Sequence, residues 1–408
     1  MKILHVLYQS TPNISGSSTR SYDLIDSQKE NGITPIIITS PFQKGYSPNK
    51  SLEIIDGCKY YRTYDGVESN EVSEKGNRII KRISKFFKIF KFYRQIKKVL
   101  KQENVDVIHA HAMFFCAIPS IIIAKKLKIP VVYEIRSLWE ERGKEKNKII
   151  SRFQYYIIRS IESYSMRKAN AVVVINKGLE ENIIKRGIKK EKITIVKNGV
   201  NSNFINEQSE KITDVLQKDY LNIGYIGSLS PIEGLDNLIK TVIKMNKEKV
   251  HSKKFRLLIY GDGISKKDLM KVAANNEYIN FMGRVNRQEI YKAYEQIEII
   301  VNPRIKNKLT DSVTPLKPLE AMCFRKPVIV SNVGGMKELI QHNETGILYN
   351  AKKPFELESA ILEYINLPTN KKKLLIDNAF NYVQSERNWM KNSETYIKLY
   401  NHIIDASY

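Results

Sequence analysis

A lysine and a glutamate three positions apart, Lys317 and Glu320, have the spacing of a nucleotide site. Lys317 stands where a helix is expected to begin, and the loop before it leaves backbone N–H groups free. Unpaired N–H groups, the helix dipole and an ammonium group together attract an anion such as phosphate. One turn further, the carboxylate of Glu320 can accept hydrogen bonds from a ribose diol. Gly334 and Gly335 follow the next expected strand and let the backbone approach a ligand closely.

Alternating strands and helices must position these residues. Continuous β-branched runs, bounded by polar turns and separated by helical stretches, indicate strands of a parallel sheet that are buried on both faces. Ligands of such sheets bind at the carboxyl ends of the strands. A loop is expected over 9–19 and a helix from about Thr19 to Asn31. Strands are expected at 2–8, 35–38, 105–111, 129–136 and 171–175, and again at 221–226, 256–260, 279–281, 297–301 and 327–331.

The length of the chain predicts two domains. At 408 residues it exceeds the size at which a single core keeps growing. Two successive strand–helix series predict an α/β fold with two Rossmann-like domains facing across a cleft. We expect an N-terminal domain over 1–200, a polar linker over 201–218, a C-terminal domain over 219–386 and a terminal amphipathic helix over 387–408.

The composition is that of a globular protein. Hydrophobic residues make up 42% and charged residues 27%, which excludes a disordered chain. The three cysteines (Cys58, Cys116 and Cys323) lie far apart, which excludes a structural zinc site and suits a reducing compartment. The most apolar stretch, 113–127, is interrupted by Pro119 and two lysines. We therefore expect a cytoplasmic protein without a membrane span.

Basic residues are concentrated in the first half of the chain. The net charge is +24, and residues 1–200 hold 37 Lys and Arg against 19 Asp and Glu. This asymmetry predicts an anionic partner: nucleic acid, an anionic membrane surface or a phosphorylated substrate. An AT-rich genome, which inflates lysine everywhere, is the alternative cause.

One segment, 75–101, combines basic and large apolar residues at helical spacing. It is either a helix packed on its own sheet with a solvated lysine face, or a helix that lies against anionic phospholipid. The basic residues are Lys75, Arg78, Lys81, Arg82, Lys85 and Lys88, and the apolar ones are Ile79, Ile80, Ile83, Phe86, Phe87 and Phe90.

Motifs along almost the whole chain resemble glycosyltransferase family 4, which comprises retaining nucleotide-sugar enzymes of the GT-B fold. In order, they are Ser15-Gly16, His109-Ala-His111, the segment 133–139 (YEIRSLW), Asn198-Gly199-Val200, Gly227-Ser228, Gly261-Asp262-Gly263, 281–284 (FMGR) and 315–322 (PLKPLEAM). Taken together they are specific, although any one alone is weak. The resemblance implies a terminal helix that packs back on the N-terminal domain.

The resemblance also implies roles for individual residues. Glu320 matches the glutamate that binds the ribose, and His111 matches the histidine near the transferring sugar and diphosphate. His109 and His111 would share a strand face, and without a ligand role both are merely strand-end residues; we expect His109 to be structural. The residues expected to bind the donor are Gly16, Gly227, Ser228, Gly283, Arg284, Val285, Thr314, Pro315, Leu316 and Glu320.

Three residues depart from the family at the donor site. Ser228 and Glu233 stand where the family usually has arginine and lysine, and Ser312, next to Asp311, stands at the first glutamate of the family's pair. Our hypothesis is that Arg304 and Lys317 supply the missing positive charges, which makes His111, Arg304 and Lys317 the expected catalytic residues. The combined pattern resembles a subgroup associated with exopolysaccharide loci and exosortases. The chain has no Asp-x-Asp, so neither a metal nor a cofactor is expected.

These features predict transfer of a hexosyl or N-acetylhexosaminyl group, with retention, from a nucleotide diphosphate sugar, favouring UDP. The expected acceptor is a polyprenyl-diphosphate-linked saccharide in bacterial surface polysaccharide synthesis, at the inner face of the plasma membrane. The residues expected on the acceptor side are Arg20, Glu134, Arg136, Trp139 and Glu140; interdomain ion pairs are their alternative role. Two other functions stay open: a sugar-nucleotide epimerase of the same fold, and a basic nucleic-acid-binding protein.

Overall fold

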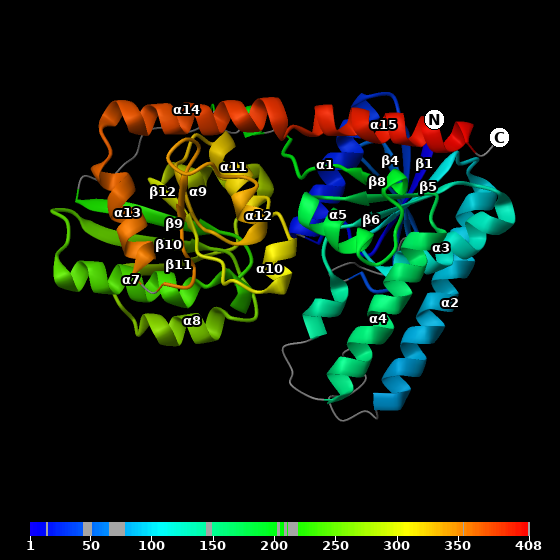
Figure 1. Cartoon of the computed structure of the whole chain (residues 1–408), viewed down its shortest axis with the longest axis horizontal. Helices are drawn as coiled ribbons and strands as arrows, with labels where there is room; N and C mark the ends of the chain where they lie inside the picture. Colours follow the sequence, from blue (N-terminus) through cyan, green and yellow to red (C-terminus); the bar gives the residue numbers. More distant parts are fainter. Residues whose placement is uncertain are drawn as a thin grey trace. The chain divides into compact units, whose positions relative to one another are not determined.

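The computed structural model describes residues 1–13, 15–43, 51–64, 78–143, 149–201, 205–207, 210, 219–353 and 355–406. The chain forms two compact units (Figure 1). The first comprises Met1–Lys197 together with Trp389–Tyr408, and the second comprises Asn198–Asn388. The terminal helix therefore belongs to the first unit, although the whole second unit precedes it in the sequence.

The first unit is built on an eight-stranded sheet in the order β3-β4-β2-β1-β5-β6-β7-β8. All neighbouring strands are parallel except β3 and β4. The strands are β1 (Lys2–Leu7), β2 (Thr34–Thr39), β3 (Leu52–Ile55), β4 (Cys58–Arg62), β5 (Val107–His111), β6 (Val131–Ile135), β7 (Ala171–Val174) and β8 (Ile193–Ile195). The helices are α1 (Gly16–Glu30), α2 (Arg78–Gln102), α3 (Phe114–Leu127), α4 (Ile149–Lys168), α5 (Lys177–Ile184) and α15 (Trp389–Asp405), with 3-10 turns at Trp139–Gly143 and Lys190–Lys192.

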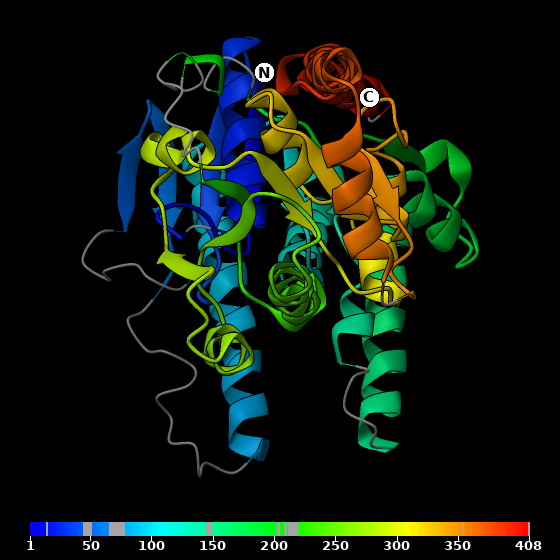
Figure 2. The ribbon, with the colours of Figure 1, turned by 90° about the vertical axis from the view of Figure 1, so that its left-hand side faces the viewer.

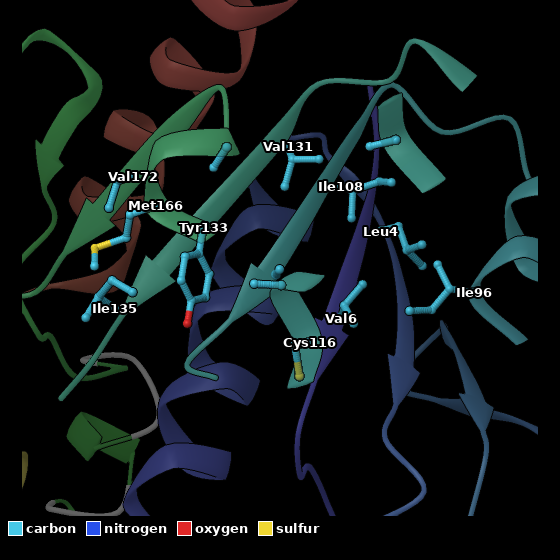
Figure 3. Close-up of a cluster of buried hydrophobic side chains, with 14 of the residues drawn as sticks. Leu4, Val6, Ile96, Ile108, Cys116, Val131, Tyr133, Ile135, Met166 and Val172 are labelled. Carbon is cyan, nitrogen blue, oxygen red and sulfur yellow. The ribbon is translucent and has the colours of Figure 1, made fainter. Parts of the chain in front are cut away.

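Alternation along the central strands gives this sheet two different faces. Leu4, Ile108 and Tyr133 point to one face and pack against α2, α3 and α4, as Figure 3 shows for part of this cluster. Ile3, Val107 and Val132 point to the opposite face, which α1 and α15 cover. Further along the same strands, toward their carboxyl ends, this second face becomes polar. Its polar part contributes to the candidate site.

Helix α2 belongs partly to the core and partly to the surface. Phe92, Ile96 and Val99 of its second half are buried, as expected of a helix packed on its own sheet. Phe87 is 66% and Phe90 54% exposed. The N-terminal parts of α2 and α4 run beyond the sheet of their unit (Figure 2). Lys75 and the side chains of 78–86, which carry most of the two faces expected from the sequence, lie outside the described residues.

The second unit has a six-stranded, all-parallel sheet in the order β11-β10-β9-β12-β13-β14. Its strands are β9 (Tyr220–Ile226), β10 (Lys254–Tyr260), β11 (Ile279–Gly283), β12 (Ile299–Asn302), β13 (Val328–Ser331) and β14 (Ile347–Tyr349). Its helices are α7 (Leu235–Glu248), α8 (Lys266–Ala273), α9 (Ile290–Glu295), α10 (Lys308–Ser312), α11 (Lys317–Cys323), α12 (Gly334–Lys337), α13 (Glu356–Asn366) and α14 (Thr369–Glu386), with 3-10 turns at Pro231–Glu233 and Arg287–Glu289.

The ten strands expected from β-branched runs are confirmed, whereas two expected helix starts are wrong. Helix α1 begins at Gly16 and not near Thr19, because Ser15 caps it and exchanges hydrogen bonds with Ser18. The terminal helix begins at Trp389 and not at Arg387, which is the C-cap of α14. None of the helices in the described part of the chain combines the length and hydrophobicity that a membrane span requires.

Candidate active site

Arg304 and Lys317 of the second unit converge on the carboxylate of Glu233. Arg304 Nη2 lies 3.0 Å and Lys317 Nζ 2.9 Å from Glu233 Oε1, and Arg304 Nε donates to Oε2 at 3.2 Å. Burial alone would raise the pKa of Glu233, but the ammonium of Lys317 and the guanidinium of Arg304 lower it to about 2. Burial lowers the pKa of Lys317, and Glu233 opposes that effect. The two cations and one carboxylate carry a net charge of about +1 at neutral pH.

The backbone around this cluster is fixed by close packing. Gly234 has a φ of +67°, and a Cβ there would lie 2.2 Å from the carbonyl oxygen of Pro303. The N–H of Ile305 donates to the carbonyl of Ile232 at 3.1 Å, and the hydroxyl of Ser331 donates to the carbonyl of Arg304 at 2.7 Å. The turn that carries Glu233 is therefore held directly against the segment that carries Arg304.

Lys317 also reaches the loop that follows β9. Its Nζ donates to the hydroxyl of Tyr225 at 2.6 Å, and that hydroxyl donates to the carbonyl of Ser228 at 2.9 Å. Gly227 has a φ of +150°, and a Cβ there would lie 2.1 Å from Lys317 Cε. Only glycine therefore lets the lysine cross this position. Gly227 and Ser228, both expected at the donor, contact Lys317 directly or through Tyr225.

The loop before Glu320 is packed against two glycines. A Cβ on Gly334 would lie 2.3 Å from the carbonyl oxygen of Asp311, and one on Gly335 would lie 2.1 Å from that of Val313. The carboxylate of Asp311 accepts from the N–H of Gly334 at 2.8 Å, so Asp311 contacts the start of α12. The carbonyl of Thr314 accepts from Asn198. Thr314, Pro315 and Leu316 are buried, whereas Glu320 is half-buried in the first turn of α11.

The expected nucleobase segment lies at the end of β11. Gly283 has a φ of +79°, and no atom lies within 4 Å of the Cβ position there. Its carbonyl accepts from the N–H of Gly261 at 2.6 Å, which joins the ends of β10 and β11. The exposed guanidinium of Arg284 lies 3.3 Å from Asp262, and Val285 is half-buried. Gly283, Arg284 and Val285 thus stay at the accessible carboxyl edge of the sheet.

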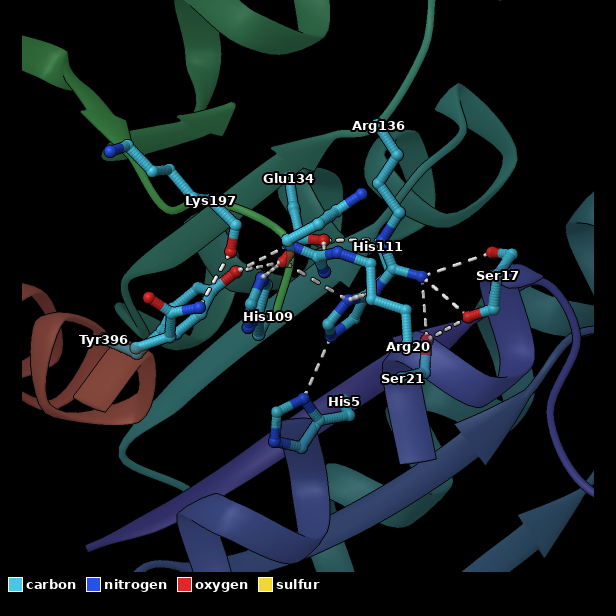
Figure 4. Close-up of polar contacts among 12 residues, drawn as sticks. His5, Ser17, Arg20, Ser21, His109, His111, Glu134, Arg136, Lys197 and Tyr396 are labelled. Atoms are coloured by element: carbon cyan, nitrogen blue, oxygen red, sulfur yellow. Dashed lines mark hydrogen bonds and ion pairs between the residues drawn. The ribbon is translucent and has the colours of Figure 1, made fainter. Parts of the chain in front are cut away.

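In the first unit, Glu134 is the centre of a buried polar network (Figure 4). Its Oε1 accepts from Arg20 and from Arg136, and its Oε2 accepts from the hydroxyl of Tyr396 at 2.6 Å. Burial alone would raise the pKa of Glu134, but Arg136 and Arg20 hold it well below its usual range. Strand pairing places Glu134 beside His111.

Three histidines complete this network. Nδ1 of His111 accepts from Arg136 at 2.7 Å, and its Nε2 lies 2.9 Å from Nδ1 of His5. Nδ1 of His109 lies 2.7 Å from the hydroxyl of Tyr400, and its Nε2 lies 3.2 Å from Glu134 Oε2. Burial lowers the pKa of each of the three histidines. We call His5, Arg20, His109, His111, Glu134, Arg136, Tyr396 and Tyr400 the histidine network.

All five residues expected on the acceptor side lie in the first unit. Arg20, Glu134 and Arg136 belong to the histidine network, and Glu140 is buried and pairs with Arg186. The indole of Trp139 lies 6.4 Å from the ring of Tyr8. The carboxylates of Glu134 and Glu140 are thus buried inside the first unit, where they pair with its arginines. Gly16, the first residue of α1, is exposed with open space around it.

The histidine cluster does not favour a divalent cation. The ligand nitrogens of His5, His109 and His111 lie within 4.8 Å of one another, which is close enough for a shared metal. However, the rings of His109 and His111 are stacked with centroids 3.9 Å apart, so their lone pairs do not converge. The guanidiniums of Arg20 and Arg136 would also repel a cation. The cluster is better described as a hydrogen-bonded network.

Several contributors to these sites were not expected from the sequence. His5 lies in the middle of β1, in register with His109, and a histidine in an otherwise apolar strand was a usable signal. Tyr396 and Tyr400 belong to the terminal helix, which was expected to be amphipathic but to which no site residue was assigned. Glu233 was noted only as a departure from the family, although it joins the two expected cations.

Comparison with known proteins identifies the family. The family model described as Glycosyltransferase Family 4 matches residues 14–204, and the one described as Glycosyl transferases group 1 matches residues 221–366. Among curated relatives, the uncharacterized glycosyltransferase MJ1069 of Methanocaldococcus jannaschii is 25% identical over 77% of this chain and 79% of its own length. The N,N'-diacetylbacillosaminyl-diphospho-undecaprenol alpha-1,3-N-acetylgalactosaminyltransferase of Campylobacter jejuni is 25% identical over 78% of this chain and 82% of its own.

Solved structures share the fold across the whole chain. Sucrose-phosphate synthase from Thermosynechococcus elongatus has a TM-score of 0.75 at 16% identity and covers 99% of both chains. Alr3699/HepE of Anabaena, in complex with UDP and glucose, has a TM-score of 0.68 at 14% identity and covers 98% of this chain and 100% of its own. The fold is GT-B, and the chain belongs to glycosyltransferase family 4.

Proposed function

We propose that this glycosyltransferase transfers a hexosyl or N-acetylhexosaminyl group from a nucleotide diphosphate sugar, with UDP as the nucleotide, and retains the anomeric configuration. The observation that carries the proposal is the convergence of Arg304 and Lys317 on Glu233. This cluster lies among the loops that follow β9 and β12, at the carboxyl edge where parallel sheets bind ligands. The Anabaena neighbour holds UDP and glucose.

In this mechanism the two cations stabilise the departing diphosphate. Negative charge grows on the diphosphate as the glycosidic bond stretches, and preorganised donors aimed at that charge lower the barrier. Glu233 holds both cations in place, and Nη1 of Arg304 has no hydrogen-bond partner among the described residues. The carboxylate of Glu320 binds the ribose. The departing phosphate oxygen helps to deprotonate the acceptor hydroxyl, and neither a metal nor a cofactor takes part.

A panel of UDP-, GDP- and ADP-sugars in a thermal-shift assay tests the donor. Only the correct donor should raise the melting temperature strongly, because a ligand at 100 times its Kd adds about 2.7 kcal/mol of stability. A melting temperature that no sugar nucleotide changes would oppose the proposal. EDTA should leave transfer unchanged, and donor isomerisation without any acceptor would instead indicate an epimerase.

We also propose that the acceptor is a polyprenyl-diphosphate-linked saccharide of bacterial surface polysaccharide synthesis, reached from the anionic inner face of the plasma membrane. The lipid-linked acceptor in the name of the Campylobacter jejuni relative supports this proposal. So do exposed aromatic residues on two helices of the first unit. These are Phe87 and Phe90 on α2 and Phe153 and Tyr156 on α4, and the exposed residues Lys91, Arg94 and Arg152 lie on the same helices.

Flotation with vesicles tests this membrane surface. Vesicles rich in anionic lipid should bind the protein at low salt, and 0.5 M salt should release it. Replacing both Phe87 and Phe90 by serine should weaken binding several-fold. Leu374→Ser, which changes an exposed residue of the second unit, should not. Equal flotation of all variants would place the membrane contact elsewhere, and a nucleic acid that binds at physiological salt would favour the alternative partner.

A further inference from the structure

We propose that Tyr396 and Tyr400 of the terminal helix α15 are positioning residues that fix, through the histidine network, His111 and the first turn of α1. Both hydroxyls are fully buried. Each reaches a different member of the network: Tyr396 reaches Glu134 and Tyr400 reaches His109. The segment that completes the site of the first unit therefore comes after the second unit in the chain.

The first path runs from Tyr396 to the start of α1. Tyr396 donates to Glu134, and the carboxylate of Glu134 accepts from Nε of Arg136. The other side of the Arg136 guanidinium donates to the carbonyl and hydroxyl of Ser17 and to the hydroxyl of Ser21, at 2.8–3.2 Å. Ser17 immediately follows Gly16. Glu134 thus holds the guanidinium of Arg136 between the first turn of α1 and the ring of His111.

Arg136 also dictates the protonation of His111. A guanidinium can only donate, so Nδ1 of His111 must accept and its single proton must lie on Nε2. That proton is donated to Nδ1 of His5, 2.9 Å away, which places the proton of His5 on its own Nε2. A second proton on His111 would face the guanidinium donor-to-donor. His111 is therefore held as one neutral tautomer.

The second path runs from Tyr400 to His109. Gln28 donates to the hydroxyl of Tyr400 at 3.1 Å, so that hydroxyl is free to donate to Nδ1 of His109. Nε2 of His109 then carries the proton and faces the carboxylate of Glu134. The proton positions are therefore consistent along the path from Gln28 through Tyr400 and His109 to Glu134. Removal of the Tyr400 hydroxyl leaves Nδ1 of His109 without its donor, and removal of the Tyr396 hydroxyl takes one of its donors from Glu134.

Long-range ¹H–¹⁵N spectra of the histidine side chains in the full chain test the proposal. The chain has 6 histidines, and single His→Gln variants assign them. Wild type should show Nε2-protonated rings for His5, His109 and His111. Tyr396→Phe should shift the His111 nitrogens, and Tyr400→Phe should shift those of His109. Tyr164→Phe, which removes an exposed hydroxyl on α4, is the control and should change neither.

Activity gives the second readout, and this part rests on the proposed function. Each of the two variants should lower kcat about tenfold, the factor of one lost hydrogen bond, and leave the KM for the donor within twofold. Nitrogen shifts of His109 and His111 that stay at wild-type values in both folded variants would overturn the proposal. If one of the two variants does not fold, the nitrogen shifts of the other decide whether the proposal holds. If wild type transfers no sugar, the donor assignment fails, and the spectra still decide the positioning role.

Discussion

Replacing Glu233 by glutamine tests how much the second unit depends on its buried ion cluster. A carboxyl whose pKa falls from 4.5 in its reference state to about 2 in the folded protein stabilises that protein by about 3 kcal/mol at pH 7. Glutamine keeps the shape of the side chain but loses this charge, and it leaves Arg304 and Lys317 as neighbouring cations. We therefore expect Glu233→Gln to lower the free energy of unfolding of the second unit by about 3 kcal/mol at pH 7.

The stability that Glu233 contributes should depend on pH. A depressed carboxyl pKa contributes stability in full above the unfolded value of 4.5. The contribution is lost as the pH falls toward the folded value of about 2. The difference between wild type and Glu233→Gln should therefore shrink from about 3 kcal/mol at pH 7 to about 1.4 kcal/mol at pH 3.

Hydrogen exchange in urea, followed by mass spectrometry on peptides of β9 and β12, measures the difference within the second unit. Tryptophan fluorescence would not, because both tryptophans of the chain, Trp139 and Trp389, lie in the first unit. Glu358→Gln is the matched control, since it breaks a partly exposed pair with Lys244 and should therefore change the stability much less than Glu233→Gln. A loss that is equal at pH 7 and pH 3, or no loss at all, would refute the reasoning.

Three further predictions concern single side chains. Arg304→Ala should lower kcat/KM by about 10²–10³, as for one lost oxyanion donor, whereas Arg325→Ala, which removes an exposed arginine of the same unit, should leave turnover kinetics normal. Gly261→Ala should destabilise the second unit by about 3 kcal/mol or more in urea unfolding, because its Cβ would lie 1.8 Å from a backbone oxygen. Gly16→Ala, with open space, should be nearly neutral. Burial raises the pKa of Glu162 to about 7, so wild type should lose stability relative to Glu162→Gln as the pH rises from 4.5 to 7; parallel stability curves would contradict this.

The central strands were predictable because β-branched runs are the direct signature of strands buried on both faces. The strands that the sequence did not reveal lack that signature. In β3 (LEII) and β4 (CKYYR) charged residues interrupt the apolar ones, and β8 and β14 have only three residues each. Local pattern identifies a strand only where burial is uniform along it.

The sequence predicted which residues belong to the candidate site, but not which side chains they pair with. Family motifs pointed to Lys317, and a departure from them pointed to Arg304, but Glu233 lies 71 positions before Arg304 and only the fold brings them together. The terminal helix was expected to be amphipathic, and Tyr396 and Tyr400 lie on its buried side. Their hydroxyl partners lie 262 and 291 positions away, which no local pattern encodes.

The interrupted sequence of the first unit has a consequence during synthesis. Residues 198–388 are contiguous, so the second unit can reach its native structure as soon as they leave the ribosome. The first unit, although translated earlier, must wait for Trp389, Tyr396 and Tyr400 to complete its interior. A nascent chain stalled before residue 389 should therefore expose the polar half of the earlier sheet to proteases and chaperones, while the later-made unit is already resistant.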